Sequence, residues 1–127
     1  TNGASHIEVK YHDDKLYLIE VNLRGGGDDI SNKLVLLSSG IDYLRSMIEV
    51  ALGIFKEPVQ VNKPAFAGIY FLCKQTEDLI PFFERAKNKP WCVEEKIFTR
   101  ELQESHSNYE RNGYLIYKSD HKITPEN

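Results

Sequence analysis

Apolar and polar positions near the start of the chain follow the pattern of a β-hairpin. Strands are predicted over His6–Tyr11 and Leu16–Leu23, with a turn at Asp13-Asp14 between them. The second strand begins with a run of apolar residues that hardly alternates with polar ones, so both of its faces are expected to be covered there.

Helical segments are predicted after a glycine-rich loop. The loop spans Gly25–Asp29, and a short helix or an irregular apolar segment follows it over Ile30–Leu37. A clearer helix begins near Gly40, with Ser39 as its N-cap and Gly53 as its terminator. Its apolar residues recur near helical spacing and form one stripe: Ile41, Leu44, Ile48, Ala51 and Leu52.

Strand-like segments dominate the second half of the chain. A linker with two prolines is predicted over Lys56–Pro64. The strands expected after it are Ala65–Lys74, Trp91–Arg100 and Gly113–Lys118. These elements predict an α+β fold in which helices pack on an antiparallel β-sheet.

The helix in this second half has two candidate starting points. Thr76 could cap it, although Pro81 would then remove a hydrogen bond just past the first turn. A start at Pro81 avoids that cost, and either helix ends near Lys87. Glu101–Arg111 is expected to be a loop, and the tail from Ser119 is expected to fray.

Composition narrows the class of protein. The 127 residues are 41% hydrophobic and 28% charged, which is typical of one globular domain or two tightly packed subdomains. The net charge of −3 argues against nucleic acid as a partner. No apolar run reaches the roughly 18 residues of a membrane span, and no signal peptide is recognisable, so a cytoplasmic location is expected. Cys73 and Cys92 are interpreted as reduced, buried residues, although sequence alone leaves a disulfide open.

The end of the predicted hairpin carries an unusual set of polar residues. Glu20, Asn22 and Arg24 lie two residues apart, so on a strand they point to one face. Two oxygen ligands and a fixed cation on one face suit a Mg²⁺–phosphate centre. The pattern therefore predicts nucleotide–metal chemistry.

Glu8 joins this set in only one register of the hairpin. With a loop of two or four residues, Glu8 pairs opposite Ile19 and the two carboxylates face apart. With a three-residue loop over Asp13–Lys15, Glu8 lies directly across from Glu20, with their Cβ atoms roughly 4.5–5.5 Å apart. Carboxylates that close repel each other unless cations lie between them. In the alternative interpretation, Arg24 simply forms ion pairs with the two carboxylates.

At these residues the chain resembles the ATP-grasp superfamily. The order and spacing of four segments are similar to the last part of the ATP-grasp catalytic fold: His6–Lys10, Leu18–Gly26, Gly40–Asp42 and Ala51–Gly53. Residues after Pro64 resemble, more weakly, the small β-rich C-terminal subdomain of L-amino-acid-ligase-like carboxylate–amine ligases. The resemblance implies that residues 1–60 belong to the catalytic domain and residues 61–127 to the small subdomain.

The resemblance also implies an activity and a set of roles. Such enzymes use ATP and Mg²⁺ (or Mn²⁺) to join a small carboxylate to an amine, or to another nucleophile, through an acylphosphate. By position, Glu8 and Glu20 would bind Mg²⁺, Glu20 would bridge two ions, and Asn22 would bind the second. Arg24 would steady the γ-phosphate or the acylphosphate as charge develops. The elements that grip ATP in this superfamily lie upstream of Glu8, so the chain is expected to be a C-terminal piece that binds ATP weakly or not at all by itself.

Several residues around the pattern allow two interpretations. Gly25–Gly27 either lets a substrate approach the backbone closely or is a plain loop. Asp28 and Asp29 either meet a substrate amine or lie in a solvated loop. His6 either orients a metal-bound carboxylate or is an ordinary strand histidine.

A different class of function is the alternative: a non-catalytic interaction or dimerisation domain with a vestigial motif. In that hypothesis the part after Pro64 mediates homodimer contacts. Its aromatic residues could line the interface, although core packing is their commoner fate: Tyr70, Phe71, Phe82, Phe83 and Trp91.

Overall fold

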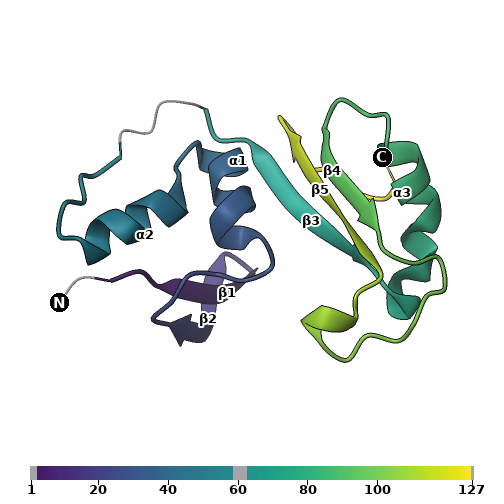
Figure 1. Cartoon of the computed structure of the whole chain (residues 1–127), viewed down its shortest axis with the longest axis horizontal. Helices are drawn as coiled ribbons and strands as arrows, with labels where there is room; N and C mark the ends of the chain where they lie inside the picture. The colour runs from purple at the N-terminus through teal and green to yellow at the C-terminus, as the bar shows by residue number, and fades with distance from the viewer. Residues whose placement is uncertain (1–2, 59–62, 127) are drawn as a thin grey trace. The chain divides into compact units, whose positions relative to one another are not determined.

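A computed structural model describes residues 3–58 and 63–126, which form two compact units (Figure 1). Within these ranges unit 1 comprises residues 3–36 and 40–58, and unit 2 comprises residues 37–39 and 63–126. The antiparallel sheets and short helices confirm the expected α+β fold class. The predicted linker lies partly outside the described residues. No helix in the described ranges is long and apolar enough to cross a membrane.

The predicted hairpin is present in unit 1. Strands β1 (His6–His12) and β2 (Lys15–Asn22) pair antiparallel and form a two-stranded sheet. The start of β2 is not covered as expected, because Leu16, Leu18 and Ile19 are 70%, 65% and 58% exposed. A two-stranded sheet by itself has no second layer of structure against which these apolar side chains could be buried.

Two short helical segments follow the glycine-rich loop, where the sequence allowed a helix or an irregular segment. A π-helix, η1 (Ile30–Leu34), leads directly into α1 (Val35–Ser39). Gly40 ends α1 with a left-handed φ of 78°, and its N–H donates to the Leu36 carbonyl at 2.9 Å. Ser39 is therefore the last residue of α1, and its prediction as the next helix's N-cap is wrong.

Helix α2 (Tyr43–Ala51) is capped by Asp42, whose carboxylate accepts a hydrogen bond from the Arg45 N–H at 3.0 Å. Gly53 follows its end with a φ of 70°, as predicted for a terminator. The predicted apolar stripe is largely exposed, with Ile48 and Leu52 at 61% and 66%. The half-buried face lies beside it and consists of Tyr43, Ser46, Met47 and Val50.

The three strands predicted in the second half form the sheet of unit 2. Its order is β3 (Phe66–Leu72), β5 (Gly113–Ser119), β4 (Cys92–Ile97), and both pairings are antiparallel. The last strand in sequence thus lies in the middle of the sheet. The predicted loop between β4 and β5 contains one short 3₁₀ turn, η3 (Asn108–Glu110).

The helix of unit 2 begins at the later of its two predicted starting points. A 3₁₀ segment, η2 (Lys74–Leu79), precedes α3 (Ile80–Ala86), which has Pro81 in its first turn. Thr76 does not begin the α-helix. Its hydroxyl accepts from the Cys73 N–H at 3.1 Å and donates to the Phe71 carbonyl at 2.8 Å, so it fastens the 3₁₀ segment to the end of β3.

One hydrophobic core holds α3 against the sheet. Its buried members are Leu72, Phe82, Phe83, Ala86, Leu115, Tyr117 and Ile123. The aromatic side chains considered for a dimer interface mostly pack here. Phe82 stacks on Trp91 with ring centroids 5.9 Å apart and meets Tyr70 edge-on at 5.2 Å. Phe71 lies under the Arg111 guanidinium.

The tail after β5 is ordered into this core, so the expected fraying is wrong. Ile123 is only 2% exposed, and its carbonyl accepts a hydrogen bond from the Tyr70 hydroxyl at 2.8 Å. Arg85 of α3 donates to the Pro125 carbonyl at 3.0 Å. These contacts fasten the tail at Ile123 and at Pro125.

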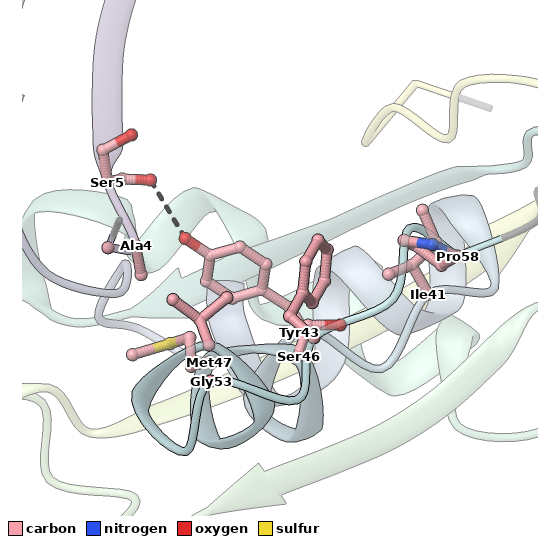
Figure 2. Close-up of a pocket in the computed structure, with 11 residues that line it drawn as sticks. Ala4, Ser5, Ile41, Tyr43, Ser46, Met47, Gly53 and Pro58 are labelled. Carbon is pink, nitrogen blue, oxygen red and sulfur yellow. Dashed lines mark hydrogen bonds between the residues drawn. The ribbon is translucent and has the colours of Figure 1, made fainter. Parts of the chain in front are cut away.

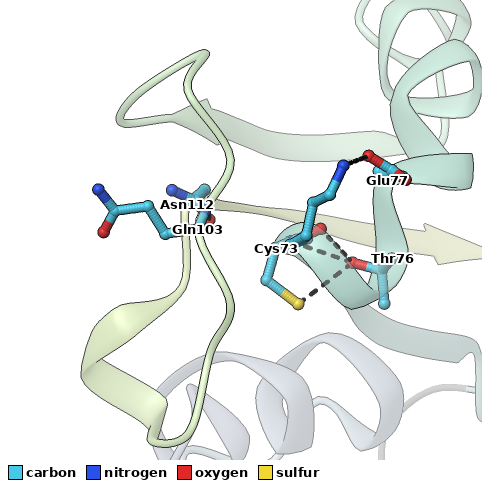
Figure 3. A network of polar contacts seen from close by, with 6 residues as sticks. Cys73, Thr76, Glu77, Gln103 and Asn112 are labelled. Carbon is cyan, nitrogen blue, oxygen red and sulfur yellow. Dashed lines mark hydrogen bonds and ion pairs between the residues drawn. The ribbon is translucent and has the colours of Figure 1, made fainter.

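Buried Asn112 holds the loop before β5 in place (Figure 3). Its side-chain oxygen accepts from the Gln103 N–H at 3.1 Å, and its side-chain nitrogen donates to the Glu101 carbonyl at 3.3 Å. Its backbone N–H donates to the Leu72 carbonyl at 2.7 Å. One amide side chain thereby supplies hydrogen-bond partners for loop backbone groups that lie outside the strand pairings.

Both cysteines are free thiols, as interpreted from the sequence, but the expected burial holds only for Cys73, because Cys92 is half-buried. Cys73 is buried at the start of η2. Burial, and secondarily the Glu95 carboxylate, raises the pKa of Cys92.

Candidate metal and phosphate site

The hairpin places Glu8 directly opposite Glu20, and His6 opposite Asn22. Because His6 and Glu8 are two residues apart on β1, and Glu20 and Asn22 two apart on β2, the four side chains share one face. The cross-strand pairing that brings the two glutamates together is thus confirmed.

The loop that produces this register differs from the prediction. The turn has two residues rather than three: Asp13 and Asp14, with φ of 48° and 55°, as a type I′ turn requires. A two-residue turn alone would pair Glu8 with Ile19. Instead the register shifts between Glu8 and Val9, whose partners are Glu20 and Leu18. Ile19 is the extra residue of a β-bulge, and the bulge restores the glutamate pair.

The two glutamates are open to solvent, whereas Asn22 is half-buried at the end of β2. Arg24 lies just beyond the strand, and its Nη1 donates to the Gly25 carbonyl at 2.9 Å. Within the described ranges no ion pair joins Arg24 to Glu8 or Glu20. The guanidinium and the carboxylates therefore remain available to a ligand.

The donor set fits part of a magnesium site. Mg²⁺ prefers oxygen ligands, and proteins commonly bind it through one or two carboxylates, leaving other positions to water and phosphate. Glu8, Glu20 and the Asn22 amide supply that kind of donor. No group of three or more His, Cys, Asp or Glu residues is placed to hold a metal ion among residues 3–58 and 63–126. The arrangement can therefore supply half of a site and would need oxygens from another molecule or segment.

Three buried polar atoms around the base of the hairpin lack a hydrogen-bond partner: His6 Nδ1, Asn22 Nδ2 and Ser31 Oγ. Two of these atoms belong to His6 and Asn22, which the sequence had already indicated as candidate site residues. Ser31, in η1, is a site residue that sequence reasoning missed, because a serine within an apolar segment gives no signal of its burial. It is only 7% exposed.

Two of the three loop glycines are required by close packing. A Cβ on Gly25 would lie 2.9 Å from Ser31 Oγ and 3.2 Å from Met47 Sδ. A Cβ on Gly26 would lie 2.9 Å from Ile30 Cγ2 and 3.1 Å from His6 Cδ2. A side chain at either position would therefore force the neighbouring side chains to shift. Gly25 and Gly26 thus pack closely against neighbouring side chains, whereas a Cβ on Gly27 would meet nothing within 4 Å.

Asp28 and Asp29, which follow the three glycines, shape the backbone at the start of η1. Asp28 and Asp29 both adopt left-handed φ values, 52° and 61°. The Asp29 carboxylate accepts from Asn32 Nδ2 at 2.7 Å and lies 3.7 Å from Lys33 Nζ. Asp29 is thus engaged at the start of η1 and is not free for a substrate amine.

Met47 connects this loop with a pocket of about 580 Å³ in unit 1 (Figure 2). The pocket lies between the segment before β1 and helix α2, and the Tyr43 hydroxyl donates to the Ser5 carbonyl across it at 3.0 Å. Apolar side chains supply much of the lining, including Ile41, Val50 and Phe55.

Of the comparisons with known proteins, the one with solved structures found a match. No protein-family model and no curated protein matches the chain. Among solved structures, the crystal structure of L-amino acid ligase from Bacillus licheniformis matches it with a TM-score of 0.62. The chain has the fold of part of an L-amino acid ligase. At 20% identity, the match covers 94% of this chain and 31% of that enzyme.

The shared fold confirms, at the level of structure, the predicted resemblance to L-amino-acid ligases. The chain spans about a third of the ligase it matches, and the agreement extends over both units because nearly all of the chain is covered.

Proposed function

We propose that this chain supplies the Mg²⁺-binding half-site of an ATP-dependent carboxylate–amine ligase that works through an acylphosphate. The observation that carries the proposal is the bulged hairpin, which sets Glu8 opposite Glu20 and next to Asn22 in a ligase-like fold. A bulge that restores this one pairing is the kind of irregularity found next to active sites.

In this proposal the three oxygen-bearing side chains hold Mg²⁺ or Mn²⁺. Glu8 and Glu20 would bind the cations, with Glu20 shared between two of them, and Asn22 would bind the second. The bound cations would neutralise charge on the phosphates of ATP. The chain's own part is to fix the carboxylates in position and to keep them exposed.

Arg24 is the group proposed to act on the transferred phosphoryl group. Its guanidinium cannot lose its proton at ordinary pH and offers several N–H donors to phosphate oxygens. The bond to the Gly25 carbonyl holds it at the end of β2. It would steady the γ-phosphate, and then the acylphosphate before the amine attacks the carbonyl carbon and phosphate leaves.

The exposed hairpin supports placing unit 1 within a larger catalytic domain. Large apolar side chains on both strands are about half exposed or more, among them Ile7, Tyr11, Leu16 and Val21. Monomeric proteins rarely leave such a patch open. We assign residues 1–60 to the C-terminal part of an ATP-grasp catalytic domain and residues 61–127 to a small β-rich subdomain. The 127-residue chain alone should then bind ATP weakly or not at all, and tight binding in calorimetry would contradict this.

The proposed ligase takes ATP, a small carboxylate and an amine, with no nucleic acid or membrane partner. A cytoplasmic location is part of the proposal, because both cysteines are free thiols and reduced thiols are typical of that compartment.

The decisive variant for the activity is Glu20→Gln in the ligase that carries this chain. It keeps the side chain's size but removes the charge that holds the cations, so amine-dependent ADP release should fall by about 100-fold or more. Glu77→Gln in unit 2 is the matched control and should leave the rate unchanged, because Glu77 forms a surface ion pair with neighbouring Lys74. Normal ADP release by Glu20→Gln would refute the metal role.

A further inference from the structure

The polar atoms left without partners at the base of the hairpin form the feature of unit 1 that packing does not explain. Ser31 is more than nine-tenths buried, and its hydroxyl has no partner. Nδ1 of His6 and Nδ2 of Asn22 are also buried atoms without a partner, in side chains that are half-buried as a whole. A buried polar group without a partner costs about 1–3 kcal/mol, so three in one region are unusual in a native structure.

All three residues border the same two-glycine segment. Ser31 packs against Gly25, His6 packs against Gly26, and Asn22 is the cross-strand partner of His6. A Cβ on Gly25 would meet Ser31 and Met47, and a Cβ on Gly26 would meet Ile30 and His6, so the two glycines leave room beside these side chains. The three residues with unpaired atoms are thus neighbours around one short segment, and none of the three atoms has a hydrogen-bond partner among the described residues.

The chemistry of the three atoms is that of hydrogen-bond donors. An amide nitrogen only donates, a serine hydroxyl can donate, and an imidazole Nδ1 donates in its Nδ1–H tautomer. Donors from three side chains suit a group that only accepts, and bonds to an ionised acceptor are the strongest. The Arg24 guanidinium, held on the Gly25 carbonyl, adds a positive charge to the same segment.

We propose that His6, Asn22 and Ser31 bind an anionic oxygen group, a carboxylate or a phosphoryl group, beside the glutamate pair. The inference rests on the proposed function in one respect. Glu8 and Glu20 share the face of His6 and Asn22, so their charge opposes an anion until a divalent cation neutralises it. Anion binding should therefore be stronger with Mg²⁺ present, and by linkage the anion should strengthen Mg²⁺ binding equally.

The test is an NMR titration of the isotope-labelled 127-residue chain with inorganic phosphate and, separately, with sodium acetate, each with and without Mg²⁺. We expect saturable shifts of the Asn22 side-chain amide, the His6 ring nitrogens and the Ser31 amide, with at least tenfold tighter binding in Mg²⁺ (about 1.4 kcal/mol of coupling). Phosphate and acetate arms distinguish a phosphoryl from a carboxylate ligand.

Ser31→Ala gives a second readout that a structural role would not produce. Removing an unpaired buried hydroxyl should leave the melting temperature unchanged or raised, while anion affinity falls by about tenfold, the loss of one charge-assisted hydrogen bond. Ser107→Ala, at an exposed serine in unit 2 that makes no capping bond, should change neither.

The outcomes separate this inference from the proposed function. The absence of saturable shifts at these residues with either anion overturns the inference, whatever the metal does. The inference is also overturned if Ser31→Ala lowers the melting temperature and leaves the anion affinity unchanged. If anions bind at Ser31 but Mg²⁺ has no effect and Glu20→Gln binds the cation as the wild type does, the inference stands and the metal half-site fails.

Discussion

Glu8 and Glu20 differ from the other acidic residues of the hairpin in lying opposite each other across two strands. Asp13 and Asp14 are adjacent in sequence at the turn, where their left-handed backbone shapes the hairpin. The sequence identified the residue types of the candidate site, because alternation on a strand decides which residues share a face. It could not identify Ser31, because burial of a single hydroxyl depends on what packs around it.

Asn112 provides a residue-scale prediction for unit 2. Replacing it with alanine removes the acceptor of the Gln103 N–H and the donor to the Glu101 carbonyl. The free energy of unfolding should fall by about 1–3 kcal/mol, because buried loop groups lose their partners. Urea unfolding followed by tryptophan fluorescence measures it, since Trp91 packs against the core of this unit.

The matched control is Asn108→Ala, an exposed asparagine in the same loop whose side chain accepts from Arg111. It should cost less than about 0.5 kcal/mol. Equal losses for the two variants would show that the Asn112 side chain does not organise the loop.

The elements of the hairpin were predictable, but the register was not. Alternation and the Asp13-Asp14 signal predicted two strands and a turn. The number of loop residues determines the register only where the pairing beyond the loop is regular. The structure combines a two-residue turn with a bulge at Ile19, and a bulge leaves little trace in a pattern of hydrophobic and polar positions. Similarly, the helix pattern around Gly40 did not reveal that Gly40 ends one helix before Asp42 begins the next.

Deletion of single residues tests the role of the bulge. Deleting Ile19 makes the ladder regular while Glu20 stays opposite Glu8, so Mn²⁺ binding should persist. Deleting Val9 instead moves Glu8 toward Leu18, which should abolish binding, because a one-residue slip separates the two carboxylates. Cross-strand NOEs report the register and Mn²⁺ relaxation reports binding. Loss of binding in the Ile19 deletion with the register intact would show that the bulge itself is required.

At the scale of the whole molecule, each unit uses its apolar residues differently. Unit 2 buries a core between α3 and its three-stranded sheet. Unit 1 leaves large apolar side chains exposed on both hairpin strands and on α2. The sequence predicted the strands of both, since periodicity reports secondary structure. It could not predict which apolar faces find a partner. The burial of Ile123 was not predictable either, because an isolated apolar residue in a polar tail has no periodicity.

Ile123→Ala tests whether the tail belongs to the core of unit 2. Truncating a fully buried isoleucine should lower the free energy of unfolding by about 2–5 kcal/mol, through lost burial and a cavity. Ile97→Ala is the control, since Ile97 in β4 is 42% exposed; its cost should be clearly smaller. A loss for Ile123→Ala no larger than the control's would mean that the tail contributes little to the core.

The most direct test of the account asks where a divalent cation binds on the isotope-labelled chain. Added Mn²⁺ should broaden the resonances of Glu8, Glu20 and Asn22 first, because a paramagnetic ion between the glutamates lies closest to them. Glu20→Gln should remove the effect, and Glu77→Gln should retain it. Broadening centred on Asp13 and Asp14 at the turn, or spread evenly over exposed carboxylates, would contradict the metal half-site.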